Sequence, residues 1–156
     1  FSIKCQLSKE LAIMNPYLVQ ARELLSRFYG YRDFRPAQVP VIESLLTGHD
    51  ALAIMPTGAG KSICFQIPAL IFPGLTLVIS PLISLMSQVD ALSEQGIPAT
   101  YINSSLSLAE SDARLSAIAQ GRYKLVYVAP ERLSTSYFQY IIDKQTISMV
   151  AVDEAH

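Results

Sequence analysis

The amino-acid sequence predicts an α/β domain in which helices flank a parallel β-sheet on both faces. Short runs rich in Val, Ile and Leu recur along the chain, and they are continuously apolar, a pattern typical of strands buried on both faces of a parallel sheet. Segments of helical length separate these runs, and strands that alternate with helices at this spacing indicate parallel pairing. The expected strands are ALAIM (51–55), LTLVIS (75–80), ATYI (99–102), KLVYVA (124–129) and ISMVAV (147–152).

The helices are predicted from the residues at their ends. Asn15 with Pro16 begins one helix, which ends before Gly30. Ser107, followed three residues later by Glu110, forms a capping box that begins another helix. Glycine is favoured just after a helix because it adopts the left-handed conformation required there. The glycines expected to close helical segments are Gly30, Gly48, Gly74, Gly96 and Gly121.

The composition fits one folded domain. Of the 156 residues, 51% are hydrophobic and 16% are charged, which provides material for a core and argues against disorder. The 12 basic residues and 13 acidic residues give a net charge of −1. This balance excludes binding to nucleic acid or to a membrane through general positive charge.

Cysteine content and hydropathy bear on the compartment. Cys5 and Cys64 are too few for a metal site or a disulfide framework, which favours a reducing compartment. No segment approaches the roughly 18 consecutive apolar residues that a membrane span needs. We therefore expect a cytosolic protein with no membrane partner. Because the chain begins at Phe1 without Met and stops at His156, after an acidic cluster, we expect it to be a piece of a longer protein.

A glycine-rich loop follows the first predicted strand and precedes a helix. This order is the context of a phosphate-binding loop, because glycines let backbone N–H groups converge on phosphate oxygens at a helix N-terminus. Lys61 can reach the β and γ phosphates of a nucleotide, and the Ser62 hydroxyl can bind Mg²⁺. Met55 stands where the general pattern has glycine, so an ordinary loop with an accidental Gly-Lys pair is the alternative. The expected nucleotide contacts are Thr57, Gly58, Ala59, Gly60, Lys61 and Ser62.

Two carboxylates follow the last predicted strand. Asp153 lies at the carboxyl end of a buried strand, which is the edge of an open α/β sheet where ligands bind. Asp153 would hold Mg²⁺ through water, and Glu154 would orient or deprotonate an attacking water. The alternative is two solvated carboxylates at a strand end.

These motifs together resemble those of a known family. M-P-T-G-A-G-K-S (55–62) with D-E-A-H (153–156) is similar to the nucleotide-binding pair of superfamily two helicases, in which Met at this position is accepted. The segment Y-G-Y-R-D-F-R-P-A-Q (29–38) looks like the adenine-recognition motif of the RecQ family. V-I-S-P-L-I-S-L-M (78–86) and Y-V-A-P-E-R-L (127–133) are likewise similar to that family.

The resemblance implies a RecA-like fold and a DNA helicase of 3′ to 5′ polarity that hydrolyses ATP. It assigns residues 29–156 to the first RecA-like ATP-binding domain, truncated after the Asp-Glu-Ala-His motif, and leaves residues 1–28 as an N-terminal helical segment. The implied cofactors are ATP and Mg²⁺. The implied partners are single-stranded or forked DNA and the second RecA-like domain of the parent chain. The implied location is the bacterial nucleoid in the cytoplasm, or the nucleus of a eukaryote.

The resemblance also implies a role for each residue of the nucleotide site. Tyr31 and Arg35 sandwich the adenine while Gln38 hydrogen-bonds its edge, and an aromatic face, a planar guanidinium and a side-chain amide suit a purine. Lys61 and Glu154 are the implied catalytic residues. The implied ligands of Mg²⁺ are Ser62 and Asp153.

Three loops are implied to follow a single DNA strand. They are 80–82, 103–104 and 130–132, each after a predicted strand, so they share one sheet edge and could hold phosphates through N–H and hydroxyl groups. Taken singly, each is better interpreted as a polar turn. The segment 86–90 is one residue shorter than is usual in the family, which leaves open the inward-facing side of its helix. His156 is implied to couple the nucleotide site to the second motor domain.

Two other functions are kept as alternatives. One is an RNA helicase of the DEAH or DEAD class. The other is a nucleotide-dependent module that binds nucleic acid without turnover, although neither Lys61 nor Glu154, the residues whose loss would mark such a module, is altered here.

Overall fold

The computed structural model describes residues 16–154, apart from the side chains of residues 82–84. The chain divides after residue 71 into two compact parts. Each part has buried apolar residues of its own. The predicted boundary between residues 28 and 29 stays a prediction.

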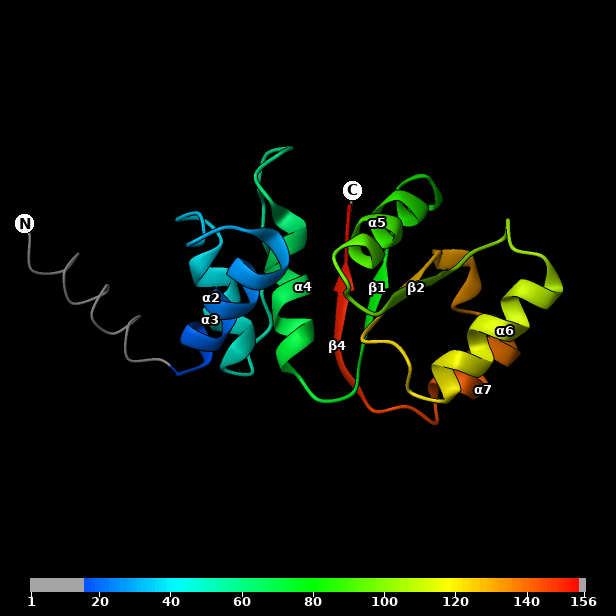
Figure 1. The fold of residues 1–156 in the computed structure, drawn as a ribbon. Helices are drawn as coiled ribbons and strands as arrows, with labels where there is room; N and C mark the ends of the chain where they lie inside the picture. Colours follow the sequence, from blue (N-terminus) through cyan, green and yellow to red (C-terminus); the bar gives the residue numbers. More distant parts are fainter. Residues whose placement is uncertain (1–15, 155–156) are drawn as a thin grey trace, which may run out of the picture. The chain divides into compact units, whose positions relative to one another are not determined.

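The first part, over residues 16–71, is built from three helices and the loops that join them (Figure 1). Helix α2 packs against α3 and α4, and α3 also packs against α4. The inward face of α2 buries Leu18, Ala21 and Leu25, which recur at the three- to four-residue spacing of an amphipathic helix. The helix ends immediately before Gly30, as predicted, while Asn15 lies outside the described residues. The bounds are α2 Pro16–Tyr29, α3 Val39–Leu46 and α4 Lys61–Ile71.

The prediction of a strand over residues 51–55 is wrong. This run belongs to no strand or helix, and its side chains Leu52 and Ile54 are 87% and 90% exposed. A strand forms only where a neighbouring strand supplies hydrogen bonds. In the described residues of the first part the other regular elements are helices, so this apolar run has no strand partner there.

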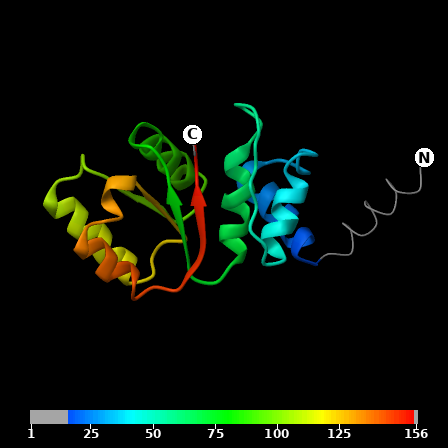
Figure 2. The same ribbon diagram turned by 180° about the vertical axis from the view of Figure 1, so that it is seen from behind.

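The second part, over residues 72–154, contains a four-stranded sheet in the order β2-β3-β1-β4. All three pairings are parallel, and Val78 of β1 lies opposite Tyr127 of β3 and Ala151 of β4. Figure 2 shows the arrows of β1 and β4 running side by side in the same direction. The prediction of a parallel sheet is confirmed, with four of the five predicted runs forming it. The bounds are β1 Leu75–Ile79, β2 Ala99–Ile102, β3 Leu125–Val128 and β4 Ile147–Val152.

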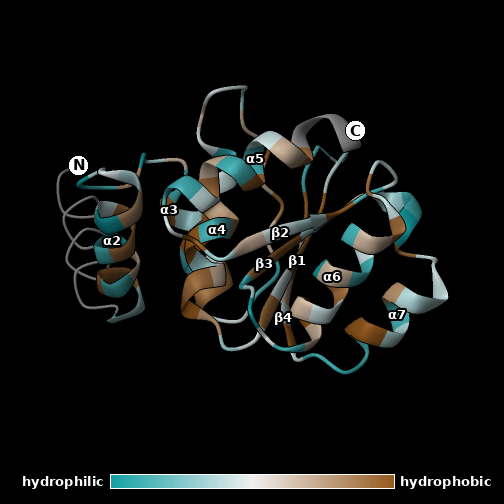
Figure 3. Cartoon of the chain, turned by 45° about the vertical axis from the view of Figure 1, so that its right-hand side comes forward, coloured by the Kyte–Doolittle hydropathy of each residue, from teal (hydrophilic) through white to brown (hydrophobic). Residues whose placement is uncertain are grey.

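Helices cover both faces of this sheet, as predicted (Figure 3). On one face Leu77 and Val126 pack with apolar residues of α6 and α7. The alternate residues Val78 and Tyr127 are fully buried on the opposite face, where α5 packs against β2 and β3. The bounds are α5 Leu82–Glu94, α6 Leu108–Ala119, the 3₁₀ helix η1 Pro130–Arg132 and α7 Ser136–Ile142.

The predicted capping box at the start of α6 is confirmed. The Ser107 hydroxyl accepts a hydrogen bond from the Glu110 backbone N–H at 3.3 Å, and a Glu110 carboxylate oxygen accepts one from the Ser107 backbone N–H at 2.9 Å. The hydrogen bonds from Ser107 hold the pKa of the Glu110 carboxyl below its usual value. Local chemistry alone therefore fixes where this helix begins.

The inward face of α5, which the sequence left open, is set by three apolar residues. Leu85, Val89 and Leu92 are buried, whereas Met86 is 47% exposed. One residue fewer turns the following side chains by about 100° around the helix. In this register Gln88 lies next to the buried residues on the helix surface, between Leu85 and Leu92.

One of the two cysteines lies within the described residues. Cys64 is buried on α4 as a free thiol, and burial raises its pKa to about 11. Cys5 lies outside the described residues. Within residues 16–154, no helix combines the length and the apolar character that a membrane crossing requires.

Candidate nucleotide site

The glycine-rich loop in the first part leads directly into the N-terminus of α4. Its turn is closed by a hydrogen bond from the Ala59 N–H to the Pro56 carbonyl at 3.1 Å. Gly58 and Gly60 adopt the left-handed conformation, with φ of 78° and 81°. At Gly60 a Cβ atom would stand 2.5 Å from Gln38 Nε2, so a side chain there would displace the Gln38 amide. The helix N-terminus and the loop N–H groups outside this turn are the groups that the sequence predicts to bind phosphate.

Lys61 and Ser62 occupy the first turn of α4. Both residues are partly buried. Lys61 forms no ion pair with the part of the chain that the structure describes. Its ammonium group is therefore available to a phosphate, as the motif predicts.

Gln38 is 2% exposed and holds the loop by its side-chain amide. Its Nε2 donates to the Gly60 carbonyl at 3.0 Å and to the Ala59 carbonyl at 3.4 Å. Its Oε1 accepts from the Arg35 backbone N–H at 2.8 Å. The amide thus ties the predicted adenine segment to the phosphate loop, a role that the sequence reasoning missed.

Arg35 makes a second link between the same two segments. The Arg35 Nη1 donates to the Gly58 carbonyl at 2.6 Å. Tyr31, four positions earlier in the same segment, has a side chain that is 54% exposed. The segment itself is braced by Arg22, whose Nε donates to Asp33 at 2.9 Å and holds the pKa of that carboxyl below its usual value. The predicted adenine contacts and the predicted phosphate contacts therefore come together in one part of the chain.

Replacing Gln38 by Ala is expected to weaken the binding of both ATP and inorganic tripolyphosphate, each by about tenfold. The reason is that two loop carbonyls lose their donor, and a factor of ten corresponds to about 1.4 kcal/mol. Titration calorimetry with both ligands on residues 1–156 measures the effect, with Gln20→Ala on the exposed side of α2 as a matched control. A variant that loses affinity for ATP but binds tripolyphosphate normally would mean that Gln38 acts only on the base.

The two predicted acidic residues follow β4 in the second part. The Asp153 N–H donates to the Ile79 carbonyl at 2.8 Å, which fixes its backbone to β1. Its Oδ1 accepts from the Glu154 N–H at 3.1 Å, and its Oδ2 accepts from Gln88 Nε2 at 3.3 Å. Glu154 is exposed and has a φ of 54°, a conformation that residues other than glycine rarely adopt. Such local strain is commonly found at functional positions.

The oxygen atoms around Asp153 suit a hard divalent cation. Its two carboxylate oxygens are hard ligands, and one of them, Oδ2, accepts from the Gln88 amide. Among residues 16–154 no group of three His, Cys, Asp or Glu side chains forms a metal site. Mg²⁺ bound with a nucleotide needs no such group, because phosphates and waters supply most of its ligands.

The loops predicted to follow DNA lie at the carboxyl ends of β1, β2 and β3, and so at one edge of the sheet. The Ser80 and Asn103 side chains are fully buried, and Asn103 Oδ1 accepts hydrogen bonds from the N–H and hydroxyl of Ser105. Exposed groups at this edge include Ser104 and Glu131, whose side chains approach each other at 3.4 Å. The buried residues shape the loops, and the exposed ones form the available surface.

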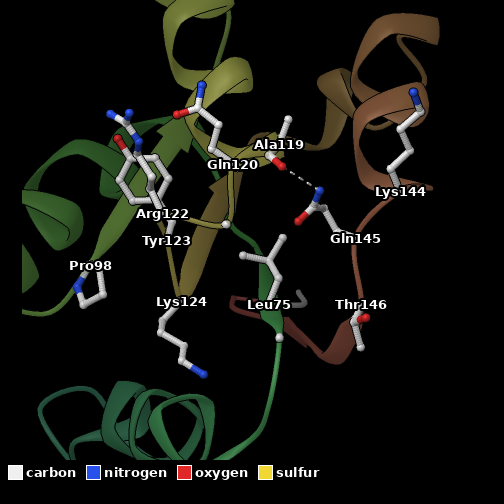
Figure 4. A pocket seen from close by; sticks show the side chains of 12 residues that line it. Leu75, Pro98, Ala119, Gln120, Arg122, Tyr123, Lys124, Lys144, Gln145 and Thr146 are labelled. Carbon is white, nitrogen blue, oxygen red and sulfur yellow. Dashed lines mark hydrogen bonds between the residues drawn. The ribbon is translucent and has the colours of Figure 1, made fainter.

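The opposite edge of the sheet carries a cavity of about 660 Å³ (Figure 4). Leu75 and Lys124, at the amino ends of their strands, line it together with Lys144. Lys124 Nζ donates to the Phe72 carbonyl at 2.8 Å and Lys144 donates to the Tyr140 hydroxyl, so both ammonium groups are already engaged. None of the predicted site residues lines this cavity.

Comparison with known protein families decides the family. The model of the DEAD/DEAH box helicases matches residues 35–156, a span that includes the phosphate loop and the acidic pair. The chain belongs to the DEAD/DEAH box helicase family. Its fold agrees, since this helicase chain has the parallel sheet with flanking helices expected of a RecA-like domain.

Curated relatives resemble the helicase chain over most of its length. It is 49% identical over 142 residues to the ATP-dependent DNA helicase RecQ of Pasteurella multocida, covering 90% of this chain and 22% of the relative. It is 51% identical over 141 residues to the protein of the same name from Bacillus subtilis, covering 89% of this chain and 24% of the relative. A further relative, the ATP-dependent DNA helicase Q-like 5 of Arabidopsis thaliana, is 41% identical over 137 residues, covering 86% and 15%. The chain thus spans about a quarter or less of the length of these relatives.

One contact at the site was not predictable from the motifs of this helicase chain. Gln88 reaches Asp153 across 65 positions of sequence. No spacing rule connects a residue on a helix to a strand end so far along the chain. The predicted role of His156 concerns a residue outside the described ones.

Proposed function

We propose that this chain is the ATP-binding first motor domain of a RecQ-type DNA helicase that couples ATP hydrolysis to 3′ to 5′ unwinding. The main observation in support is a set of hydrogen bonds that the side chains of Gln38 and Arg35 donate to carbonyls of the phosphate loop. This link joins the segment predicted to bind adenine to the loop predicted to bind phosphate, as expected if one nucleotide contacts both. The names of the relatives from P. multocida and B. subtilis support the same activity.

In the proposed nucleotide complex, the first part of the chain binds and orients ATP. The loop N–H groups other than that of Ala59, which closes the turn, would hold the phosphates together with the Lys61 ammonium by charge-assisted hydrogen bonds. The exposed ring of Tyr31 and the Arg35 guanidinium provide two flat faces for adenine. Because Arg35 also donates to Gly58, stacking on the base and shaping of the loop depend on the same side chain.

The second part supplies the acidic pair. Asp153, with Ser62 of the first part, would hold Mg²⁺, which when bound neutralises charge on the β and γ phosphates. Glu154 is exposed, and its carboxylate would orient the attacking water and accept its proton. The arginine that stabilises the transferring phosphoryl group would come from the second motor domain proposed as a partner.

The proposed DNA partner would lie along the loops after β1, β2 and β3. With a net charge of −1, the chain offers no broad basic surface. Contacts would therefore come from N–H groups and hydroxyls such as Ser104 Oγ, which position a phosphate backbone without reading its sequence. Strand-separation assays on matched DNA and RNA duplexes decide between a DNA helicase and an RNA helicase. Nucleotide-dependent binding with no turnover by the full-length protein would instead favour the binding module.

Replacing Lys61 by Ala tests the phosphate loop. The change removes a charge-assisted contact and is expected to weaken ATP by roughly 1.5–3 kcal/mol, or about ten- to a hundredfold or more. Calorimetric titration of residues 1–156 with Mg-ATP gives the result. Lys144→Ala is the matched control, because Lys144 is none of the predicted nucleotide contacts and its ammonium donates to Tyr140, so this variant should bind ATP as the wild type does. Equal affinities in the Lys61 variant and the wild type would refute the phosphate-loop assignment.

A further inference from the structure

Gln88 is a polar side chain on the packed side of α5. It neighbours Leu85 and Leu92 on the helix, and both leucines are buried. Its own Oε1 is buried and has no hydrogen-bond partner in the part of the chain that the structure describes. An unpaired buried acceptor is unfavourable for folding, and an apolar side chain would pack there without that disadvantage. Packing therefore does not explain an amide at this position.

The other end of the Gln88 amide does have a partner. Nε2 donates to Asp153 Oδ2 at 3.3 Å, across the gap between α5 and the end of β4. The opposite carboxylate oxygen, Oδ1, accepts from the Glu154 N–H at 3.1 Å. The carboxylate is thus held from two sides, once by its own turn and once by Gln88. Since the backbone of Asp153 is fixed by Ile79, Gln88 is the contact from outside the turn that sets the orientation of the carboxylate plane.

We propose that Gln88 is a positioning residue for the metal-binding carboxylate of Asp153. This inference rests on the proposed function, because it assumes that Asp153 serves a nucleotide-bound Mg²⁺. The Nε2 donor keeps the Asp153 carboxylate in one orientation. Residues that orient metal ligands in this way commonly change metal affinity by ten- to a hundredfold when they are lost.

The test measures how nucleotide binding depends on Mg²⁺. Residues 1–156 and the variant Gln88→Leu, which keeps a similar size but removes both polar atoms, are titrated with a fluorescent ATP analogue in EDTA and at increasing Mg²⁺. We expect the variant to need about tenfold more Mg²⁺ for half-maximal enhancement of binding, with its affinity in EDTA unchanged. Gln95→Leu, at the exposed end of the same helix, is the control and should match the wild type.

Each other outcome has a distinct meaning. An unchanged Mg²⁺ requirement overturns the inference, and so does an equal loss of affinity in EDTA and in Mg²⁺, which marks a general structural role. If Gln88→Leu does not fold by circular dichroism, Gln88→Asn gives the answer instead, because its shorter amide withdraws the donor while staying polar. If the wild type itself binds no nucleotide, the proposed function is wrong. That result is distinct from one in which the wild type binds nucleotide and only the proposed role of Gln88 is wrong.

Discussion

Residues 1–156 on their own are expected to bind Mg-ATP yet to hydrolyse it about 10³- to 10⁵-fold more slowly than a longer form that contains a second motor domain. This factor is the contribution of an arginine that stabilises the transferring phosphoryl group. In the proposed mechanism that arginine comes from the partner domain, whereas the ground-state contacts to ATP and Mg²⁺ lie within residues 31–154. Residues 1–156 should therefore retain ATP binding and lose most ATP hydrolysis.

Steady-state phosphate release, measured with and without single-stranded DNA, checks this expectation. DNA should not restore activity to residues 1–156, because stimulation would act by closing two motor domains on one nucleotide. The variant Lys61→Ala, which is expected to bind ATP about ten- to a hundredfold more weakly, is assayed in parallel and controls for a contaminating hydrolase, which would give the same background rate in both preparations. Strong DNA-stimulated turnover by residues 1–156 alone would contradict the two-domain mechanism.

Replacing Glu154 by Gln in the full-length protein is expected to lower the rate of ATP hydrolysis by about 10²- to 10⁴-fold, the usual contribution of a general base. The amide keeps the size of the side chain and places no new strain on the residue, whose φ is 54° in any case. It cannot accept the proton of the attacking water. Nucleotide affinity should stay close to that of the wild type, since Glu154 makes no ground-state contact to phosphate in the proposed mechanism.

Single-turnover hydrolysis combined with an ATP titration separates these two quantities. Glu94→Gln, at the exposed end of α5, removes a comparable carboxylate away from the site and should hydrolyse ATP normally. If the Glu154 variant hydrolyses ATP at the wild-type rate, another residue must be the general base. A variant that loses affinity and rate together would indicate a binding role instead.

Local signals account for what the sequence predicts well. The capping box of Ser107 and Glu110 contains its whole explanation within four residues, and the structure has it with both hydrogen bonds. The buried strands follow from continuous apolar runs, and four of them pair in parallel. The fifth, 51–55, has the same composition and no strand partner in its part of the chain, so composition alone does not separate it from the others.

Contacts between distant segments account for what the sequence does not predict. The motif assigns Gln38 to adenine, and in the structure its amide also hydrogen-bonds the loop carbonyls and the Arg35 N–H, contacts that the motif does not predict. No sequence motif predicts the contact between Gln88 and Asp153, because the two residues come together only when the sheet and α5 have packed. Both facts depend on three-dimensional placement, and they refine the candidate site rather than replace it.

The phosphate loop is held by the chain's own side chains, since Gln38 and Arg35 donate to its carbonyls. Ordering a flexible residue costs roughly 1–2 kcal/mol in backbone entropy, and for this loop that cost falls on folding rather than on binding. Nucleotide association should accordingly show a small entropic penalty, and it should stabilise the helices of the first part by mass action. The conformation of this loop depends on hydrogen bonds from residues 31–38. A substitution that makes residues 31–38 more flexible would therefore weaken phosphate binding, although it removes no phosphate contact.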